Sequence, residues 1–148
     1  MRQGISGIAA LAAALLLLLL AGTAQAEAKR GKAPEGARVY FLSPQDGQTM
    51  KSPLTVRMGL QGLEAVAASI HRHGTGHHHL LVDLELSALD LNQPLPFTEQ
   101  TRHFGGGQTE GTFALKPGTH TLQLLFMNSR HLSFDPPLVS EKITVMVK

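Results

Sequence analysis

Apolar and polar residues alternate strictly along Leu54-Thr-Val-Arg-Met-Gly-Leu60. Successive side chains of a β-strand point to opposite faces, so this spacing predicts a strand with one apolar face. The same alternation recurs in residues 120–127 and 142–147, and turn-forming proline and glycine residues separate such segments. Six or seven short strands without a long helix predict an all-β fold, a single immunoglobulin-like antiparallel β-sandwich.

The composition divides the chain into three segments. Residues 1–26 combine Arg2, an apolar run and the small-residue pattern Ala24-Gln-Ala26, which together predict a signal peptide cleaved after position 26. Residues 27–36 are polar and predict a flexible lead-in, and residues 37–148 predict the immunoglobulin-like domain. The apolar run is shorter than a comfortable membrane span, so we expect a periplasmic protein with no membrane span after cleavage.

The composition also excludes several classes of function. The 13 basic and 11 acidic residues nearly balance, which argues against a nucleic-acid partner because such partners require a basic surface. The chain has no cysteine, which excludes disulfides, thiolate metal ligands and cysteine nucleophiles. Serine-hydrolase and zinc-protease motifs are missing from the sequence, so we expect no enzymatic activity. A mononuclear copper or zinc catalyst is a third, separate interpretation.

Five of the eight histidines fall within His71-Arg-His-Gly-Thr-Gly-His-His-His79, at the start of a strand predicted over residues 78–86. In a strand, His77 and His79 share one face and lie about 7 Å apart at Cα. Two imidazoles at that spacing can converge on one metal ion. His78 falls on the opposite, more apolar face, and we expect it to point toward the core.

Other histidines complete the predicted metal site. His103, in a long connection between strands, is the third predicted ligand. His71 and His73 are auxiliary ligands, because the Gly-Thr-Gly hinge that follows them can fold them back, and His131 is a candidate remote ligand. Ligation by nitrogen without thiolate suits copper, zinc or nickel, and the affinity order favours copper, with zinc second. We therefore predict an exported, copper-binding protein without catalytic activity.

A second interpretation gives the histidines no metal. In this alternative the chain is a non-catalytic envelope module, open to an unknown protein partner, whose histidines serve loop packing or respond to pH. His120 lies on an apolar strand face and is interpreted as a structural histidine under either hypothesis.

The glycine-rich stretch His103-Phe-Gly-Gly-Gly-Gln-Thr-Glu110 invites comparison with a nucleotide-binding loop. It lacks the Lys-Ser/Thr pair of a P-loop and leads into a β segment rather than a helix. Three glycines permit a tight turn with close backbone approach, which is the interpretation favoured here. Gln108 or Glu110 could then hydrogen-bond a histidine and fix its tautomer.

Four segments of the chain carry a family resemblance: Gly74-Thr-Gly-His-His-His-Leu-Leu-Val-Asp83, residues 103–110, Pro117-Gly-Thr-His-Thr-Leu-Gln-Leu124 and residues 135–144. Together they resemble signature segments of a bacterial family catalogued as domain of unknown function 4399, over roughly residues 71–147. The resemblance implies an exported, compact β domain and no particular activity. The chain has Asn128-Ser-Arg-His131 where the family has a Gly-Asp turn before the histidine. A ligand role for His131 therefore does not carry over from the resemblance.

Overall fold

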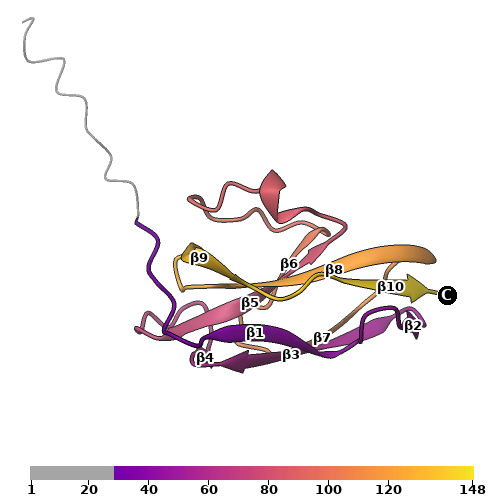
Figure 1. The fold of residues 1–148 in the computed structure, drawn as a ribbon, viewed down its shortest axis with the longest axis horizontal. Coiled ribbons are helices and arrows are strands. Elements are labelled where there is room, and N and C mark those ends of the chain that lie inside the picture. The colour runs from indigo at the N-terminus through magenta and orange to yellow at the C-terminus, as the bar shows by residue number, and fades with distance from the viewer. Residues whose placement is uncertain (1–28) are drawn as a thin grey trace, which may run out of the picture.

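The structure is a computed structural model that describes residues 29–148. Two β-sheets face each other in a sandwich (Figure 1). The smaller sheet has the order β1 (Arg38–Ser43), β3 (Leu54–Gln61), β7 (Glu110–Phe113). The larger sheet has the order β2 (Thr49–Met50), β10 (Ile143–Val147), β8 (Gly118–Met127), β5 (Thr75–Val82), β4 (Glu64–Ala65), with β6 (Thr101–His103) on β5 and β9 (Ser133–Val139) on β8.

The predicted all-β sandwich is confirmed. Most strand pairs are antiparallel, and the two short pairs β10–β2 and β4–β5 are parallel. The arrangement is compatible with the immunoglobulin-like architecture that the sequence predicts. The segment between 63 and 70, for which the sequence indicates no definite element, contains β4 and an isolated bridge from Ala67 to Gly106.

The main core lies between the two sheets. The alternation of residues 54–60 corresponds to burial in β3, where Leu54, Val56 and Met58 are buried and Thr55 and Arg57 between them are exposed. These side chains meet a buried apolar layer from the larger sheet, contributed by Leu80, Val82, Leu122, Leu124, Phe126, Ile143, Val145 and Val147. Burial of apolar area at about 25 cal/mol per Å² holds the sheets together.

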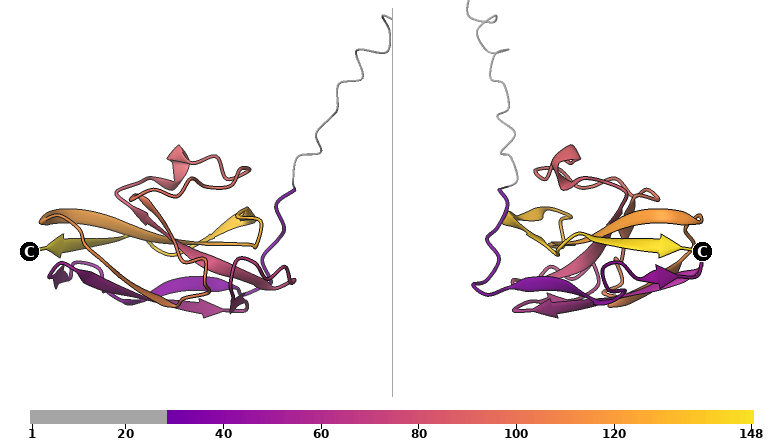
Figure 2. Two further views of the ribbon diagram at one scale, coloured as in Figure 1. Left: turned by 180° about the vertical axis from the view of Figure 1, so that it is seen from behind. Right: turned by 45° about the vertical axis from the view of Figure 1, so that its right-hand side comes forward.

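A second apolar layer covers the outer face of the larger sheet. Leu81, Leu125 and Met127 on that face pack against Leu95 from the long connection after β5. Figures 1 and 2 show this connection, which contains the short 3₁₀ helix η1 (Leu86–Ala88), lying over the sheet on the side away from β1 and β3. All eight residues of β5 are therefore buried, on both faces of the sheet.

The prediction that the strand after the histidines runs from residue 78 to residue 86 was wrong at both ends. β5 begins at Thr75 and ends at Val82. Asp83 has a left-handed backbone conformation, with φ of 52°, which ends the strand. Its side chain accepts a hydrogen bond from the Thr121 backbone N–H at 2.9 Å and contacts His120 at 2.7 Å, so the turn is anchored to β8.

Two segments predicted as loops contain strands. The connection predicted over residues 87–111 includes β6, and the loop predicted over residues 128–139 includes β9. Pro136 and Pro137 indicated a loop because proline cannot donate to a β-ladder. They are accommodated because β9 pairs with β8 only at its two ends, with a register shift between them, so the prolines occupy the unpaired stretch.

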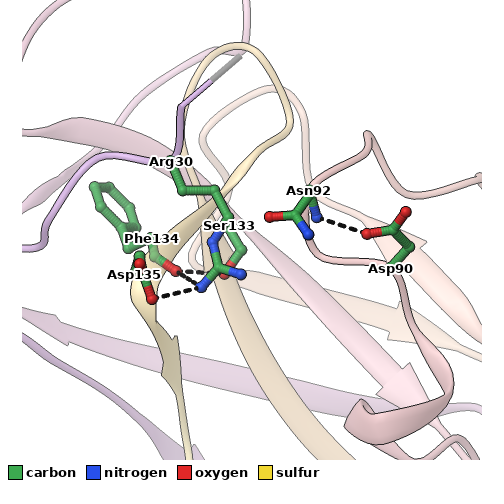
Figure 3. A network of polar contacts seen from close by, with 6 residues as sticks. All are labelled: Arg30, Asp90, Asn92, Ser133, Phe134 and Asp135. Carbon is green, nitrogen blue, oxygen red and sulfur yellow. Dashed lines mark hydrogen bonds and ion pairs between the residues drawn. The ribbon is translucent and has the colours of Figure 1, made fainter. Parts of the chain in front are cut away.

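The described part of the predicted lead-in, residues 29–36, contains no strand but is tied to the domain. The Arg30 guanidinium donates to the Phe134 carbonyl at 2.8 Å and to the Asp135 carboxylate at 3.1 Å (Figure 3). The Asp135 N–H donates to the Gly31 carbonyl at 2.9 Å. The predicted signal peptide, residues 1–26, lies outside the described residues. No helix within residues 29–148 is long and apolar enough to cross a membrane.

Candidate metal centre

Four histidines from three parts of the chain meet on the outer face of the larger sheet. His77 and His79 lie on β5, and His103 ends β6 directly opposite His79 in the strand register. His131 comes from the turn between β8 and β9. One ring nitrogen of each histidine lies within 4.8 Å of the corresponding atoms of the other three. We call these four residues the histidine cluster.

The spacing within the histidine cluster suits a single metal ion. The Nε2 atoms of His103 and His131 are 3.1 Å apart, and the ring centroids of His77 lie 4.7–4.8 Å from those of the other three members. Four nitrogens bound tetrahedrally at about 2.0–2.1 Å from a metal are roughly 3.3 Å apart. The wider pairs, up to 4.8 Å apart, would have to close by ring rotation to reach this separation, and on that condition the four histidines could hold a metal ion.

Two members of the histidine cluster, His77 and His79, are buried without hydrogen bonds, as is their neighbour His78 on the opposite face of β5. His77 and His79 have no exposed surface, and neither ring nitrogen of either residue has a hydrogen-bond partner among the described residues. A buried polar group without a partner costs about 1–3 kcal/mol. Metal coordination would engage one nitrogen of each ring and so offset part of that cost.

The protonation state of the cluster also favours metal binding. Burial, reinforced by the neighbouring imidazoles, lowers the pKa of His79 to about 2 and that of His77 to about 4. Burial likewise lowers the pKa of His103 and of His131. All four rings are therefore neutral at pH 7, and a neutral imidazole is the form that binds metal.

His131 was missing from the predicted primary ligands, and a tight turn brings it to the cluster. The Asn128 carboxamide oxygen accepts hydrogen bonds from the backbone N–H groups of Arg130 and Leu132, at 2.9 and 3.1 Å. His131 adopts a left-handed conformation with φ of 59°. In the sequence, Asn128 indicates this turn, because asparagine favours turns of this kind. It does not show that the turn lies beside His77, which follows only from the pairing of Met127 with His77.

The auxiliary ligands predicted from the sequence lie elsewhere. His71 and His73 are exposed and do not belong to the histidine cluster. The His71 Nδ1 atom is 2.8 Å from the Ser129 hydroxyl, and both histidines line a separate pocket. The Gly-Thr-Gly segment does not fold them back because Thr75 and Gly76 already belong to β5.

His78 points toward the core as predicted, with neither ring nitrogen partnered in the described residues, and His120 is hydrogen-bonded as predicted for a structural histidine. His78 is fully buried on the core side of β5, with its ring 5.1 Å from that of Phe126, and burial lowers its pKa to about 4. The two nitrogens of His120 contact the Asp83 carboxylate at 2.7 Å and the Lys116 carbonyl at 2.8 Å. The hydrogen bond to Asp83 raises the pKa of His120.

The glycine-rich stretch is a tight turn that makes room for His103, as the structural interpretation predicted. A Cβ atom on Gly105 would lie 2.2 Å from Cε1 of His103, and Gly107 has φ of 79°. The predicted orienting role of Gln108 and Glu110 was wrong. The Gln108 side chain accepts a hydrogen bond from the Gly106 N–H at 2.8 Å, and Glu110 forms an ion pair with Arg57 at 3.5 Å.

Phe97, whose aromatic ring lies over the cluster, was not among the residues predicted from the sequence. Its ring stacks on His103 with a centroid distance of 4.4 Å and an interplanar angle of 13°. It also meets His131 edge-on at 5.5 Å. Phe97 is nevertheless 63% exposed, so it forms the solvent-facing cover on the partly exposed side of the histidine cluster.

We expect the metal-free protein to lose stability as the pH falls below about 6.5, the usual pKa of an exposed histidine. A histidine whose pKa is lowered in the folded state stays neutral there while its unfolded counterpart takes up a proton. Its contribution is therefore complete above pH 6.5 and declines toward the folded pKa. For His78, with a folded pKa of about 4, the loss reaches roughly 3 kcal/mol near pH 4.

Urea unfolding of metal-free protein at pH 7.5 and pH 5.0 measures this dependence. His120, whose pKa is raised, acts in the opposite direction, since its contribution is present below pH 6.5 and lost at higher pH. Three buried histidines, His77, His78 and His79, act against this single residue. We therefore expect the free energy of unfolding to fall at low pH. Equal unfolding free energies at the two pH values would contradict this prediction.

The comparisons with known proteins bear on the same region of the chain. A family model described as "Domain of unknown function (DUF4399)" matches residues 56–148. The matched region includes all four members of the histidine cluster and the strands that position them. No curated protein matches the chain, and no solved structure does either.

Proposed function

The chain belongs to the family of domain of unknown function 4399, and on this premise we propose that it is an exported, periplasmic protein that binds copper through its histidine cluster. The carrying observation is the convergence of four imidazoles, two of them fully buried with no hydrogen-bond partner in the described residues. Export rests on the signal-peptide pattern of residues 1–26.

The donor set supports copper before zinc. All four donors are neutral imidazole nitrogens, and neither a thiolate nor a carboxylate belongs to the group. Imidazole suits both metals, and the affinity order of divalent metals places Cu(II) above Zn(II) for such a site. Magnesium and calcium are poor candidates because they require oxygen ligands.

The same geometry supports binding without catalysis. Structural metal sites use four protein ligands, whereas catalytic zinc sites keep one position for water or substrate. Four histidines around a four-coordinate ion leave no such position, and Phe97 stacks on His103 at the solvent side. The alternative in which the histidines form a hydrogen-bonded packing network has less support. His131 and His103 form one hydrogen bond of 3.1 Å, but the buried ring nitrogens of His77 and His79 have no partner in the described residues.

Calorimetric titration of untagged, metal-free protein with Cu(II) and separately with Zn(II) tests this proposal. We expect one equivalent of each metal to bind, Cu(II) more tightly than Zn(II), at pH 7.5 where the cluster is neutral. Electron paramagnetic resonance of the Cu(II) protein should show hyperfine coupling to several equivalent nitrogens. Binding no tighter than micromolar for either metal would refute the proposal.

A further inference from the structure

A concave site adjoins the turn that carries His131, because Asn128, Ser129 and Arg130 of that turn line it. It is a pocket of about 550 Å³, within the size range of small-molecule sites. Six basic or imidazole side chains line it: Lys29, Lys32, His71, Arg72, His73 and Arg130. We call it the basic pocket.

The charge of the basic pocket is one-sided. Among residues 29–148, no aspartate or glutamate lines the pocket. Arg72 forms an ion pair with Glu64 at the rim, but Lys29, Lys32 and Arg130 form no ion pair within the described part of the chain. Cations gathered in a concave site without counter-charges repel one another, and a bound anion removes that repulsion.

The fold builds this pocket from segments that are distant in sequence. The hydrogen bonds of Arg30 to Phe134 and Asp135 hold the chain beside β9 (Figure 3), which brings Lys29 and Lys32 to the pocket. Across the pocket, the His71 ring is held against the Ser129 hydroxyl at 2.8 Å. These contacts anchor a segment on each side of the pocket, and the cationic residues of both segments line it.

We propose that the basic pocket binds a small multivalent oxyanion, such as a phosphate or a polycarboxylate. Lysine ammonium groups act as point charges toward an oxyanion, and the arginine guanidinium can engage two of its oxygens at once. His71 and His73 add imidazole N–H donors. This proposal gives a role to His71 and His73, which lie outside the histidine cluster.

The oxyanion site is independent of metal binding but adjoins the histidine cluster. Arg130 lines the basic pocket and His131 belongs to the cluster, and both lie in the turn held by the Asn128 side chain. Because no residue of the histidine cluster lines the basic pocket, anion binding can be tested on the metal-free protein. Failure of the metal proposal would leave the oxyanion proposal standing, and the reverse also holds.

Titration of the metal-free full chain with inorganic phosphate and with citrate at low ionic strength tests the site. We expect saturable one-site binding of at least one of these anions. The Lys32→Ala/Arg130→Ala variant should weaken that binding at least about tenfold, because it removes two charge-assisted contacts. A matched control, Lys51→Ala/Lys148→Ala, lowers the net charge equally outside the pocket and should leave the affinity unchanged.

Three results would overturn the proposal. One is equal weakening in both double variants, which would indicate only general attraction to a basic protein. Another is the lack of saturation with either anion. The third is binding to vesicles containing phosphatidylglycerol without binding to either free anion, which would indicate a membrane surface instead. Unchanged unfolding temperatures of both variants would show that any loss does not come from misfolding.

Discussion

Replacing His77 and His79 together by alanine is expected to weaken Cu(II) binding at least about a thousandfold. These are the two fully buried members of the histidine cluster, so their removal leaves only the partly exposed His103 and His131. Loss of a residue that merely orients a ligand already costs 10–100-fold in metal affinity, and loss of two ligands costs more. Competition titration against a chelator of known affinity measures the change.

The matched control for this variant is His71→Ala/His73→Ala. It removes the same number of imidazoles from the same segment of sequence, but from residues outside the histidine cluster. We expect this control to retain the full Cu(II) affinity. If both double variants lost affinity equally, copper would be bound by the histidine-rich segment in general, and the proposed four-histidine site would be wrong.

The sequence allowed prediction of the fold wherever one face of a strand meets water. Alternation in β3 located that strand within one residue, because Thr55 and Arg57 face solvent while Leu54, Val56 and Met58 face the core. In β5 the order of apolar and polar residues did not indicate where the strand begins and ends. Both faces are buried, one by the opposite sheet and one by the connection that carries Leu95, so no alternation marks the strand ends.

The arrangement of the histidine cluster was predictable from the sequence only where its members lie on one strand. Strand geometry alone places His77 and His79 on one face. His103, the third predicted ligand, lies beside them through the register of β6 against β5, which the sequence did not indicate. His131 required long-range knowledge, since its position depends on the pairing of β8 with β5 and on the turn after Met127. His71 and His73 are close in sequence to His77, but they precede β5 and point to a different pocket.

The turn at Asn128 therefore has two consequences for the surface of this domain. It holds His131 against the cluster formed by β5 and β6, and it presents Ser129 and Arg130 to the basic pocket. Metal and anion sites that share one five-residue turn need not be coupled, because a ligand shifts an equilibrium only through different affinities for two states. Both sites nevertheless depend on the exact position of the start of β5, which lies beside this turn.

That position depends on Gly76, and Gly76→Ala is expected to destabilise the protein by roughly 3 kcal/mol or more, the upper range for overpacking a core. A Cβ atom at this residue would lie 2.2 Å from the Met127 carbonyl oxygen and 2.7 Å from the Phe126 ring. The first contact is with the backbone of the neighbouring strand, so no side-chain rotation relieves it. β5 would have to move away from β8 at the residue preceding His77.

Urea unfolding of the metal-free protein measures this effect, with Gly31→Ala as the control. A Cβ atom at Gly31 meets nothing within 4 Å, so this substitution should change the unfolding free energy by less than about 0.5 kcal/mol. If Gly76→Ala folds at all, its Cu(II) affinity should also fall, because a displaced β5 moves both His77 and His79. An alanine variant at 76 with wild-type stability would show that β5 and β8 do not approach as closely as the structure describes.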